Sequence, residues 1–208
     1  MAKLKALFLN ASLKSSEEPS NTEGLAQEVI DIYTKEGVES EIVRLADYHI
    51  PYGIEKDMGE GDEWPLIFEK VINSDIVILC SPIWLGEKSS LAMAAIERLY
   101  GSSSETNEKG QSIFYNKVGG AVVTGNEDGA KNAASSLLYG LSHIGFVIPP
   151  NVDTYWVGEA GPGPSYMDEG GQENDFTKKH VEMLACNTMH LANIFKENPI
   201  PAKGNTME

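Results

Sequence analysis

The stretch Leu4–Glu28 reads LKALFLNASLKSSEEPSNTEGLAQE and divides into three parts. Residues 4–9 form an apolar run that is typical of a buried strand. A polar loop follows over 10–22, and apolar residues at helical spacing resume at Leu25. Strand, polar loop and helix form the unit with which α/β proteins bind phosphate, because the first helical turn presents unpaired N–H groups and a positive dipole end. The stretch therefore predicts an α/β fold with a candidate phosphate site at its first loop.

The loop supplies donors that suit a phosphate ester. Its hydroxyls, its amide and its single cation belong to Ser12, Lys14, Ser16, Ser20, Asn21 and Thr22. Ser20 or Asn21 could equally cap the helix, and Glu17 and Glu18 would repel a phosphate unless both point outward. The loop has neither G-x-G-x-x-G nor G-x-x-x-x-G-K-[ST], so it matches neither of the commoner nucleotide fingerprints. Phosphate binding and a plain strand-to-helix connection both stay open on this stretch alone.

Composition excludes several classes of partner. The chain has 208 residues, 41% of them apolar, which is enough for one domain with a substantial core. Its 31 acidic and 16 basic residues give a net charge of −15, and so acidic a surface repels nucleic acid and anionic membranes. No apolar run reaches 18 residues, so we expect a soluble, cytoplasmic protein without a membrane partner. Cys80 and Cys186 form no C-x-x-C pair and are expected to be free thiols.

Strand and helix patterns alternate along the chain and predict a single α/β domain over 1–208. The predicted strands cover 4–9, 39–45, 76–80, 118–123 and 146–148, and the predicted helices cover 25–33, 64–73, 90–100, 130–144 and 176–196. We expect a core over 4–150, onto which the last helix packs. The Gly- and Pro-rich segment 153–175 is expected to be a mobile flap or an arm that contacts another subunit, and 198–208 a frayed tail.

Polar loops follow the first, third and fourth predicted strands. Beyond the first loop, these are Ser81–Ser90 and Thr124–Gly129. Ligands of open α/β sheets bind outside the carboxyl ends of the strands, so we expect the three loops to lie together on one rim. Trp84 in the second loop could stack on a flat ring, although it could also be ordinary core packing. The loops together indicate a ligand that has a phosphate and a planar ring system.

Four segments carry a resemblance to one family. Residues 10–14 with 20–22 are similar to a G-S-x-R…G-N-T phosphate loop, and Ser81-Pro82-Ile83-Trp84-Leu85-Gly86 is similar to an S-P-x-Y-x-G loop beside a flavin ring. Ile96-Glu97-Arg98 is similar to an I-D-R on the following helix, and residues 117–120 to a segment that leads into the fourth strand. These motifs belong to the flavodoxin-like NADPH-dependent FMN reductase superfamily, which the chain resembles over about residues 4–150.

The resemblance implies a fold, a cofactor and an activity. The fold would be a flavodoxin-like three-layer sandwich with a five-stranded parallel sheet of order 2-1-3-4-5 and helices on both faces. FMN would be held by Ser12, Lys14, Ser20, Asn21, Thr22, Pro82, Ile83, Trp84, Leu85, Gly86, Thr124, Gly125, Asn126 and Gly129. Hydride would pass from NAD(P)H to FMN and on to a quinone, a flavin or a similar small-molecule acceptor, in a homodimer or homotetramer. No catalytic acid, base or metal ligand is assigned.

The chain also departs from the family pattern. Asn10 replaces the usual Gly, Trp84 the usual Tyr, and Met93 stands where a Lys is usual. The iron–sulfur branch carries a cysteine cluster in the region that corresponds to residues 46–63, and this chain has no Cys there, so no such cluster is expected at that place. Two other functions stay open: a flavodoxin-type electron carrier, and a flavodoxin-fold binding module without a cofactor.

Overall fold

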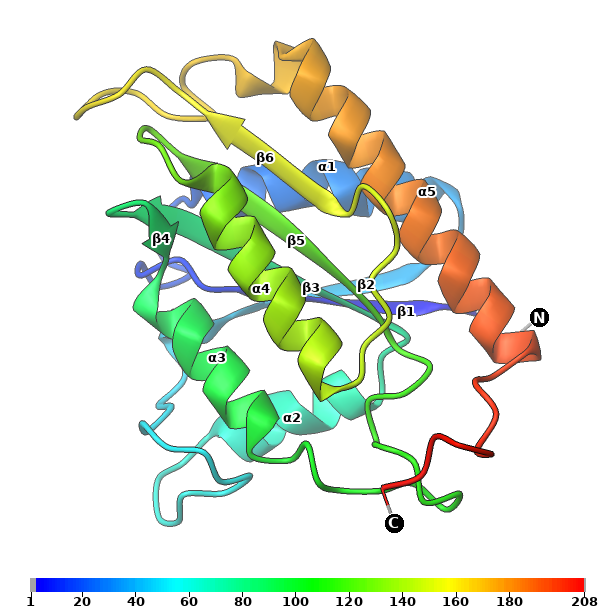
Figure 1. Ribbon diagram of the computed structural model, residues 1–208. Coiled ribbons are helices and arrows are strands. Elements are labelled where there is room, and N and C mark those ends of the chain that lie inside the picture. The colour runs from blue at the N-terminus through cyan, green and yellow to red at the C-terminus, as the bar shows by residue number, and fades with distance from the viewer. Residues whose placement is uncertain (1–2, 208) are drawn as a thin grey trace.

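A six-stranded sheet forms the middle layer of the computed structural model, which describes residues 3–207 (Figure 1). The strands are β1 (Lys5–Asn10), β2 (Glu39–Arg44), β3 (Ile76–Trp84), β4 (Glu87–Lys88), β5 (Val118–Gly125) and β6 (Asp153–Val157). Five of them are parallel in the order β2-β1-β3-β5-β6, and the two-residue β4 pairs antiparallel with the end of β3. Apart from β4, this order is the predicted 2-1-3-4-5, so the predicted topology is confirmed.

Helices cover both faces of the sheet, as predicted (Figure 1). They are α1 (Asn21–Lys35), α2 (Trp64–Ile72), α3 (Ser90–Tyr100), α4 (Ala130–Ile144) and α5 (Asp175–Glu197), with short 3₁₀ turns at Leu45–Asp47 and Gly171–Glu173. Side chains of β1 alternate between two cores: Leu7 and Leu9 pack with α2, α3 and α4, whereas Ala6 and Phe8 pack with α1 and α5. In residues 3–207, no helix combines the length and apolarity needed to cross a membrane.

The fifth parallel strand is not where the sequence predicted it. Residues 146–148 make a single bridge, Val147 to Val118, and the strand itself is β6, which runs from Asp153 opposite Ala121 to the end of β5. The prediction of a strand at 146–148 was wrong because Pro149 and Pro150 offer no N–H donor, so the ladder is interrupted and resumes after them. The first five residues of the segment predicted as a flap therefore belong to the sheet.

A second difference concerns the loop that was predicted after residue 80. β3 continues to Trp84, pairs Pro82 with Thr124 of β5, and turns through Leu85 and Gly86 into β4. β1 ends opposite Cys80, so this part of β3 has lost its neighbour on one side, where proline is tolerated. The segment predicted as a loop beside the ring is thus the end of β3 and a short β-hairpin.

The tail over 198–207 is tethered along the segment before β5. The Ile200 N–H donates to Asn116 Oδ1 at 2.7 Å, and the Met207 N–H donates to the Gly110 carbonyl at 2.9 Å. The expected frayed end is therefore held by hydrogen bonds in this structure.

The hairpin turn stores backbone strain at Leu85, which gives a first prediction. Leu85 has φ +53° and a 94% exposed side chain, whereas the other two non-glycine residues with positive φ in residues 3–207 are asparagines. A left-handed conformation costs an L-residue roughly 1–2 kcal/mol, and Asn tolerates it better. We expect Leu85→Asn to raise the free energy of unfolding by about 1 kcal/mol, measured by urea denaturation. The reverse exchange Asn151→Leu, at φ +52°, should lower the free energy of unfolding by a similar amount. The prediction would be contradicted if Leu85→Asn gave no increase and Asn151→Leu gave no decrease.

Candidate functional site

A cavity of about 710 Å³ lies at the carboxyl ends of β1, β3 and β5. Its volume is in the range of cofactor and ligand sites. The predicted site residues that line it are Ser12, Lys14, Ser20, Asn21, Thr22, Pro82, Ile83, Trp84, Thr124, Gly125 and Asn126. The remaining lining residues, which sequence reasoning did not select, are Pro19, Glu127, Gly161, Pro162, Gly163 and Ser165. The structure therefore brings the three predicted loops together, and it adds a fourth segment.

The α1 side of the cavity is built from donors. Ser20 caps α1, and its hydroxyl accepts a hydrogen bond from the Glu23 N–H at 3.2 Å. The N–H groups of Asn21 and Thr22, in the first helical turn, have no partner within the helix. Lys14 is the only cation among the described residues that line the cavity, and Glu17 and Glu18 are both exposed. Capping and anion binding are thus compatible at this helix end, because the cap uses only the third N–H of the turn.

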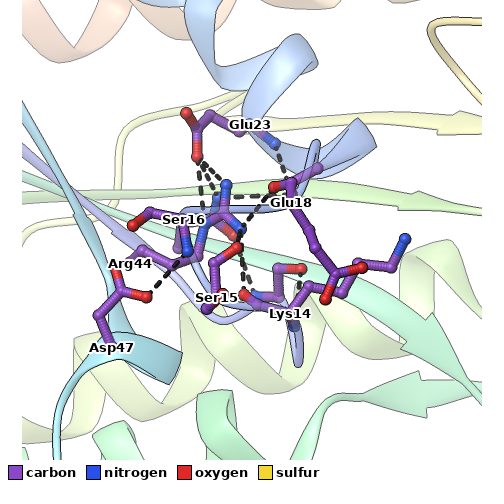
Figure 2. Close-up of polar contacts among 10 residues, drawn as sticks. Lys14, Ser15, Ser16, Glu18, Glu23, Arg44 and Asp47 are labelled. Atoms are coloured by element: carbon purple, nitrogen blue, oxygen red, sulfur yellow. Dashed lines mark hydrogen bonds and ion pairs between the residues drawn. The ribbon is translucent and has the colours of Figure 1, made fainter.

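A buried arginine that sequence reasoning missed lies behind this loop. Figure 2 shows polar contacts converging on Arg44, whose guanidinium bonds to carbonyl oxygens of the loop and to the Glu23 carboxylate. Asn10 Nδ2 donates to the same carboxylate at 3.1 Å. On the other side, the Ser16 N–H donates to Asp47 at 2.8 Å and holds the pKa of Asp47 below its usual range. In the structure Arg44 is the last residue of β2 and lies directly opposite Asn10, the last residue of β1.

The β3 side of the cavity is a braced wall. The Leu85 N–H donates to Glu127 Oε1 at 2.9 Å, and Asn132 Nδ2 donates to the Gly86 carbonyl at 3.0 Å. Gly129 lies against Gly86 so closely that a Cβ on Gly129 would lie 2.4 Å from the Gly86 carbonyl oxygen. Leu85, Gly86 and Gly129, which were predicted to contact the ring, do not line the cavity and support its wall from behind.

A single hydrogen bond joins the first and third loops. The hydroxyls of Thr22 and Thr124 lie 2.8 Å apart, and both residues are buried. Because the two residues are 102 positions apart in sequence, this bond fixes the N-terminal turn of α1 relative to the end of β5. The α1 side of the cavity and the end of β5 therefore keep a defined spacing.

The segment 158–171 folds over the cavity, where the sequence predicted a mobile flap or subunit arm. Asn126 Nδ2 donates to the Pro164 carbonyl at 2.6 Å, and the Met167 N–H donates to Asn21 Oδ1 at 2.9 Å. Tyr166 is buried, hydrogen-bonds to Glu28 and meets Trp156 edge-on, with ring centroids 5.8 Å apart. Burial raises the pKa of the Glu28 carboxyl despite this bond. The segment is thus anchored to α1 at one end and to the third loop at the other.

Ionisable side chains are scarce around the cavity. Within the described lining, only Lys14 and Glu127 are ionisable, and Glu127 already accepts the Leu85 N–H. No group of three or more His, Cys, Asp or Glu residues within 3–207 is arranged to hold a metal ion. The arrangement can therefore bind an anionic group and place a flat ring beside Trp84. It offers no paired acid and base of its own.

The chain matches one family model and is similar to known proteins in sequence and in structure. The family model described as NADPH-dependent FMN reductase matches residues 4–160. Over 205 residues the chain is 37% identical to the 8-demethyl-8-aminoriboflavin-5′-phosphate synthase of Streptomyces davaonensis, covering 94% of this chain and 80% of that protein. A crystal structure of RosB with the bound intermediate 8-demethyl-8-formylriboflavin-5′-phosphate superposes with a TM-score of 0.87 at 38% identity, covering 95% of this chain and 82% of that one.

A further relative is longer than this chain. Over 199 residues the chain is 46% identical to a Mycobacterium bovis protein named divalent metal cation transporter MntH, which covers 93% of this chain. The chain spans only 29% of the length of that relative.

Proposed function

The chain belongs to the NADPH-dependent FMN reductase family, and from this premise we propose that it is an FMN-containing oxidoreductase that uses NADH or NADPH to reduce a small-molecule acceptor such as a quinone or a flavin. The observation that carries the proposal is the cavity itself. Hydroxyl and amide donors with Lys14 lie on its α1 side, and Trp84 lies on its β3 side. A phosphate ester linked to a planar ring system matches both sides.

The lining residues offer polar contacts for the phosphate of FMN and an aromatic contact for its ring. Ser12, Lys14, Ser20, Asn21 and Thr22 would hold the phosphate, and Pro82, Ile83, Trp84, Thr124, Gly125 and Asn126 would hold the ring. The bound intermediate of RosB is itself a riboflavin-5′-phosphate derivative, which supports the same ligand class here. FMN, when bound, supplies hydride and electron transfer. The protein's part is to neutralise the phosphate with Lys14 and to exclude water with the 158–171 segment.

A second candidate function follows from the same relatives. Because a relative at 37% identity is named as a synthase of a modified riboflavin phosphate, the flavin could be the substrate here and leave chemically altered. The lining favours the cofactor role. Among the described residues that line the cavity, only Lys14 and Glu127 are ionisable, so few side chains are available for acid–base chemistry on the flavin itself. Mass spectrometry of the flavin before and after turnover separates the two functions: a cofactor returns with its mass unchanged.

Lys14→Ala gives the prediction that tests flavin binding. Removing one charge-assisted contact to a phosphate costs about 1.5–3 kcal/mol, so we expect about 10- to 150-fold weaker FMN binding in a fluorescence titration. Ser12→Ala, which removes a neutral donor, should weaken binding less, by roughly fivefold. The matched control is Lys131→Ala, an exposed lysine of α4 that lies outside the cavity and should leave FMN binding unchanged.

Reduction of the bound flavin tests the activity. Under anaerobic conditions, NADH or NADPH should bleach the flavin absorbance, and a quinone should restore it. A protein that retains FMN but is reduced by neither nucleotide would contradict the enzyme function and favour an electron carrier. A protein that retains no flavin at all would contradict the whole proposal.

A further inference from the structure

We propose that Arg44 is a positioning residue that makes the cavity select flavins carrying a 5′-phosphate. It would do so without touching the ligand, by fixing the loop 14–18 in the shape that presents Lys14 to the cavity. This inference rests on the proposed function, because it concerns the phosphate side of the same site. Nothing in the family motifs quoted above includes this position, which is the last residue of β2.

The guanidinium of Arg44 collects carbonyl oxygens from the loop. Its Nη1 donates to the carbonyls of Lys14 at 3.0 Å and Ser15 at 2.8 Å, and more distantly to that of Glu18 at 3.4 Å. The side chain is 4% exposed, so the contacts are made away from bulk water (Figure 2). A planar fork with five N–H donors can serve several acceptors at once, and a lysine ammonium cannot reproduce that geometry.

These contacts fix the orientation of the peptide groups. In a trans peptide the N–H points opposite to the preceding C=O, so a Lys14 carbonyl turned toward Arg44 directs the Ser15 N–H away from the guanidinium. The Ser16 N–H is held separately by Asp47. With the backbone held on both sides, the exposed Lys14 side chain starts from a fixed position at the edge of the cavity that it lines. Arg44 therefore acts on the phosphate side through Lys14.

The positive charge of Arg44 is paired with the carboxylate of Glu23 and does not face the cavity as a free cation. Its Nε donates to Glu23 Oε2 at 3.2 Å, and its Nη2 forms an ion pair with the same oxygen. Glu23 lies in the first turn of α1, the helix end expected to receive the phosphate. Without Arg44, this carboxylate would keep its hydrogen bond from Asn10 but would have no cation beside a ligand of its own sign. Loss of Arg44 would thus loosen the loop and add repulsion, and the two effects can be separated by also changing Glu23.

The experiment compares FMN with riboflavin, which lacks the phosphate, by fluorescence titration of the full chain. For Arg44→Met we expect FMN affinity to fall about 30-fold, and riboflavin affinity to change by less than about threefold. Arg44→Lys, which keeps the charge and is less disruptive to folding, should lose FMN affinity about tenfold. Glu23→Gln should bind FMN at least as tightly as the natural protein. Lys131→Met, with the same loss of charge outside the cavity, should leave both affinities unchanged.

The double variant Arg44→Met/Glu23→Gln decides between positioning and charge. It should stay about tenfold or more weaker for FMN, because the repelling carboxylate is gone but the loop is still loose. Full recovery of FMN affinity in the double variant would overturn the positioning role. Equal losses for FMN and riboflavin in Arg44→Met would also overturn it, as would equal affinities of the natural protein for the two flavins. If the natural protein binds FMN, the proposed function stands, whether or not riboflavin binds more weakly. If it binds neither FMN nor riboflavin, both the proposed function and the role of Arg44 are overturned.

Discussion

Replacing Arg98 by Met is expected to lower the free energy of unfolding by about 3–5 kcal/mol, the usual cost of removing one partner from a buried ion pair. Arg98 and Asp62 form an ion pair in which both side chains are fully buried. Arg98 also donates to the carbonyls of Glu55 at 2.8 Å, Pro51 at 3.1 Å and Lys56 at 3.2 Å. The variant would leave a buried carboxylate without its cation and three carbonyls without a donor. Differential scanning calorimetry should show a melting temperature roughly 6–20 °C lower.

The matched control is Lys70→Met, which removes a cation from the exposed ion pair with Glu41. That change should cost about 0–1 kcal/mol, because exposed pairs contribute little. If Arg98→Met costs no more than Lys70→Met, the buried pair does not hold the segment 51–62, which contains all of these partners of Arg98, in place. Combining Arg98→Met with Asp62→Asn should recover part of the loss, since the unpaired charge is then removed.

The same pair gives the stability a defined pH dependence. Burial alone would raise the pKa of Asp62, but the Arg98 hydrogen bond and the N–H groups of Met58 and Trp64 together hold it below its ordinary value of 3.8. A carboxyl with a lower pKa in the folded state contributes stability above its unfolded pKa and loses it as the pH falls through the folded pKa. The natural protein should therefore lose stability below about pH 4 more steeply than the Arg98→Met/Asp62→Asn variant.

The sheet order could be predicted from sequence because each central strand has a continuous apolar pattern. Apart from the exposed Lys5, the runs at 4–9, 76–80 and 118–123 are buried on both faces, as expected of parallel strands between two helical layers. β6 was misplaced because its signal is weaker: Asp153 begins a five-residue strand that is half polar, and the apolar run at 146–148 before the two prolines is a better local match. Pairing with β5, which is a long-range property, decides the position.

The cavity could be predicted from the loops that follow β1, β3 and β5, since strand ends in a parallel sheet share one edge. Arg44 and the 158–171 segment could not be predicted in the same way. Their roles depend on partners far away in the sequence, such as Asn21 for Met167, and local patterns carry no information about such contacts. Leu85, Gly86 and Gly129 lie next to the cavity but outside its lining, and a motif gives order along the chain and not which atoms face a cavity, so their predicted contact with the ring stays a prediction.

Gly129→Ala is expected to weaken FMN retention about tenfold or more while leaving the protein folded. Gly129 has φ +117° at the start of α4, and an added Cβ would lie 2.4–2.6 Å from the carbonyl oxygen, Cα and carbonyl carbon of Gly86. All three atoms of Gly86 belong to the backbone, so no neighbouring side chain can rotate away, and the hairpin turn must move. Because that turn follows Trp84 directly, its displacement would shift the wall of the cavity. Gel filtration of FMN-loaded protein, with the flavin-to-protein absorbance ratio as readout, measures the loss.

The control for Gly129→Ala must carry the same backbone penalty without the clash. Gly59 meets this requirement, because its φ is +100° and an added Cβ would find nothing within 4 Å. Gly59→Ala should cost about 1–3 kcal/mol of stability from backbone strain alone and should retain FMN as the natural protein does. Gly129→Ala adds the displacement of Gly86 to that strain. Equal FMN retention in the two variants would mean that the hairpin turn can move without disturbing the site, and the role of Gly129 as the support of the ring-side wall would be wrong.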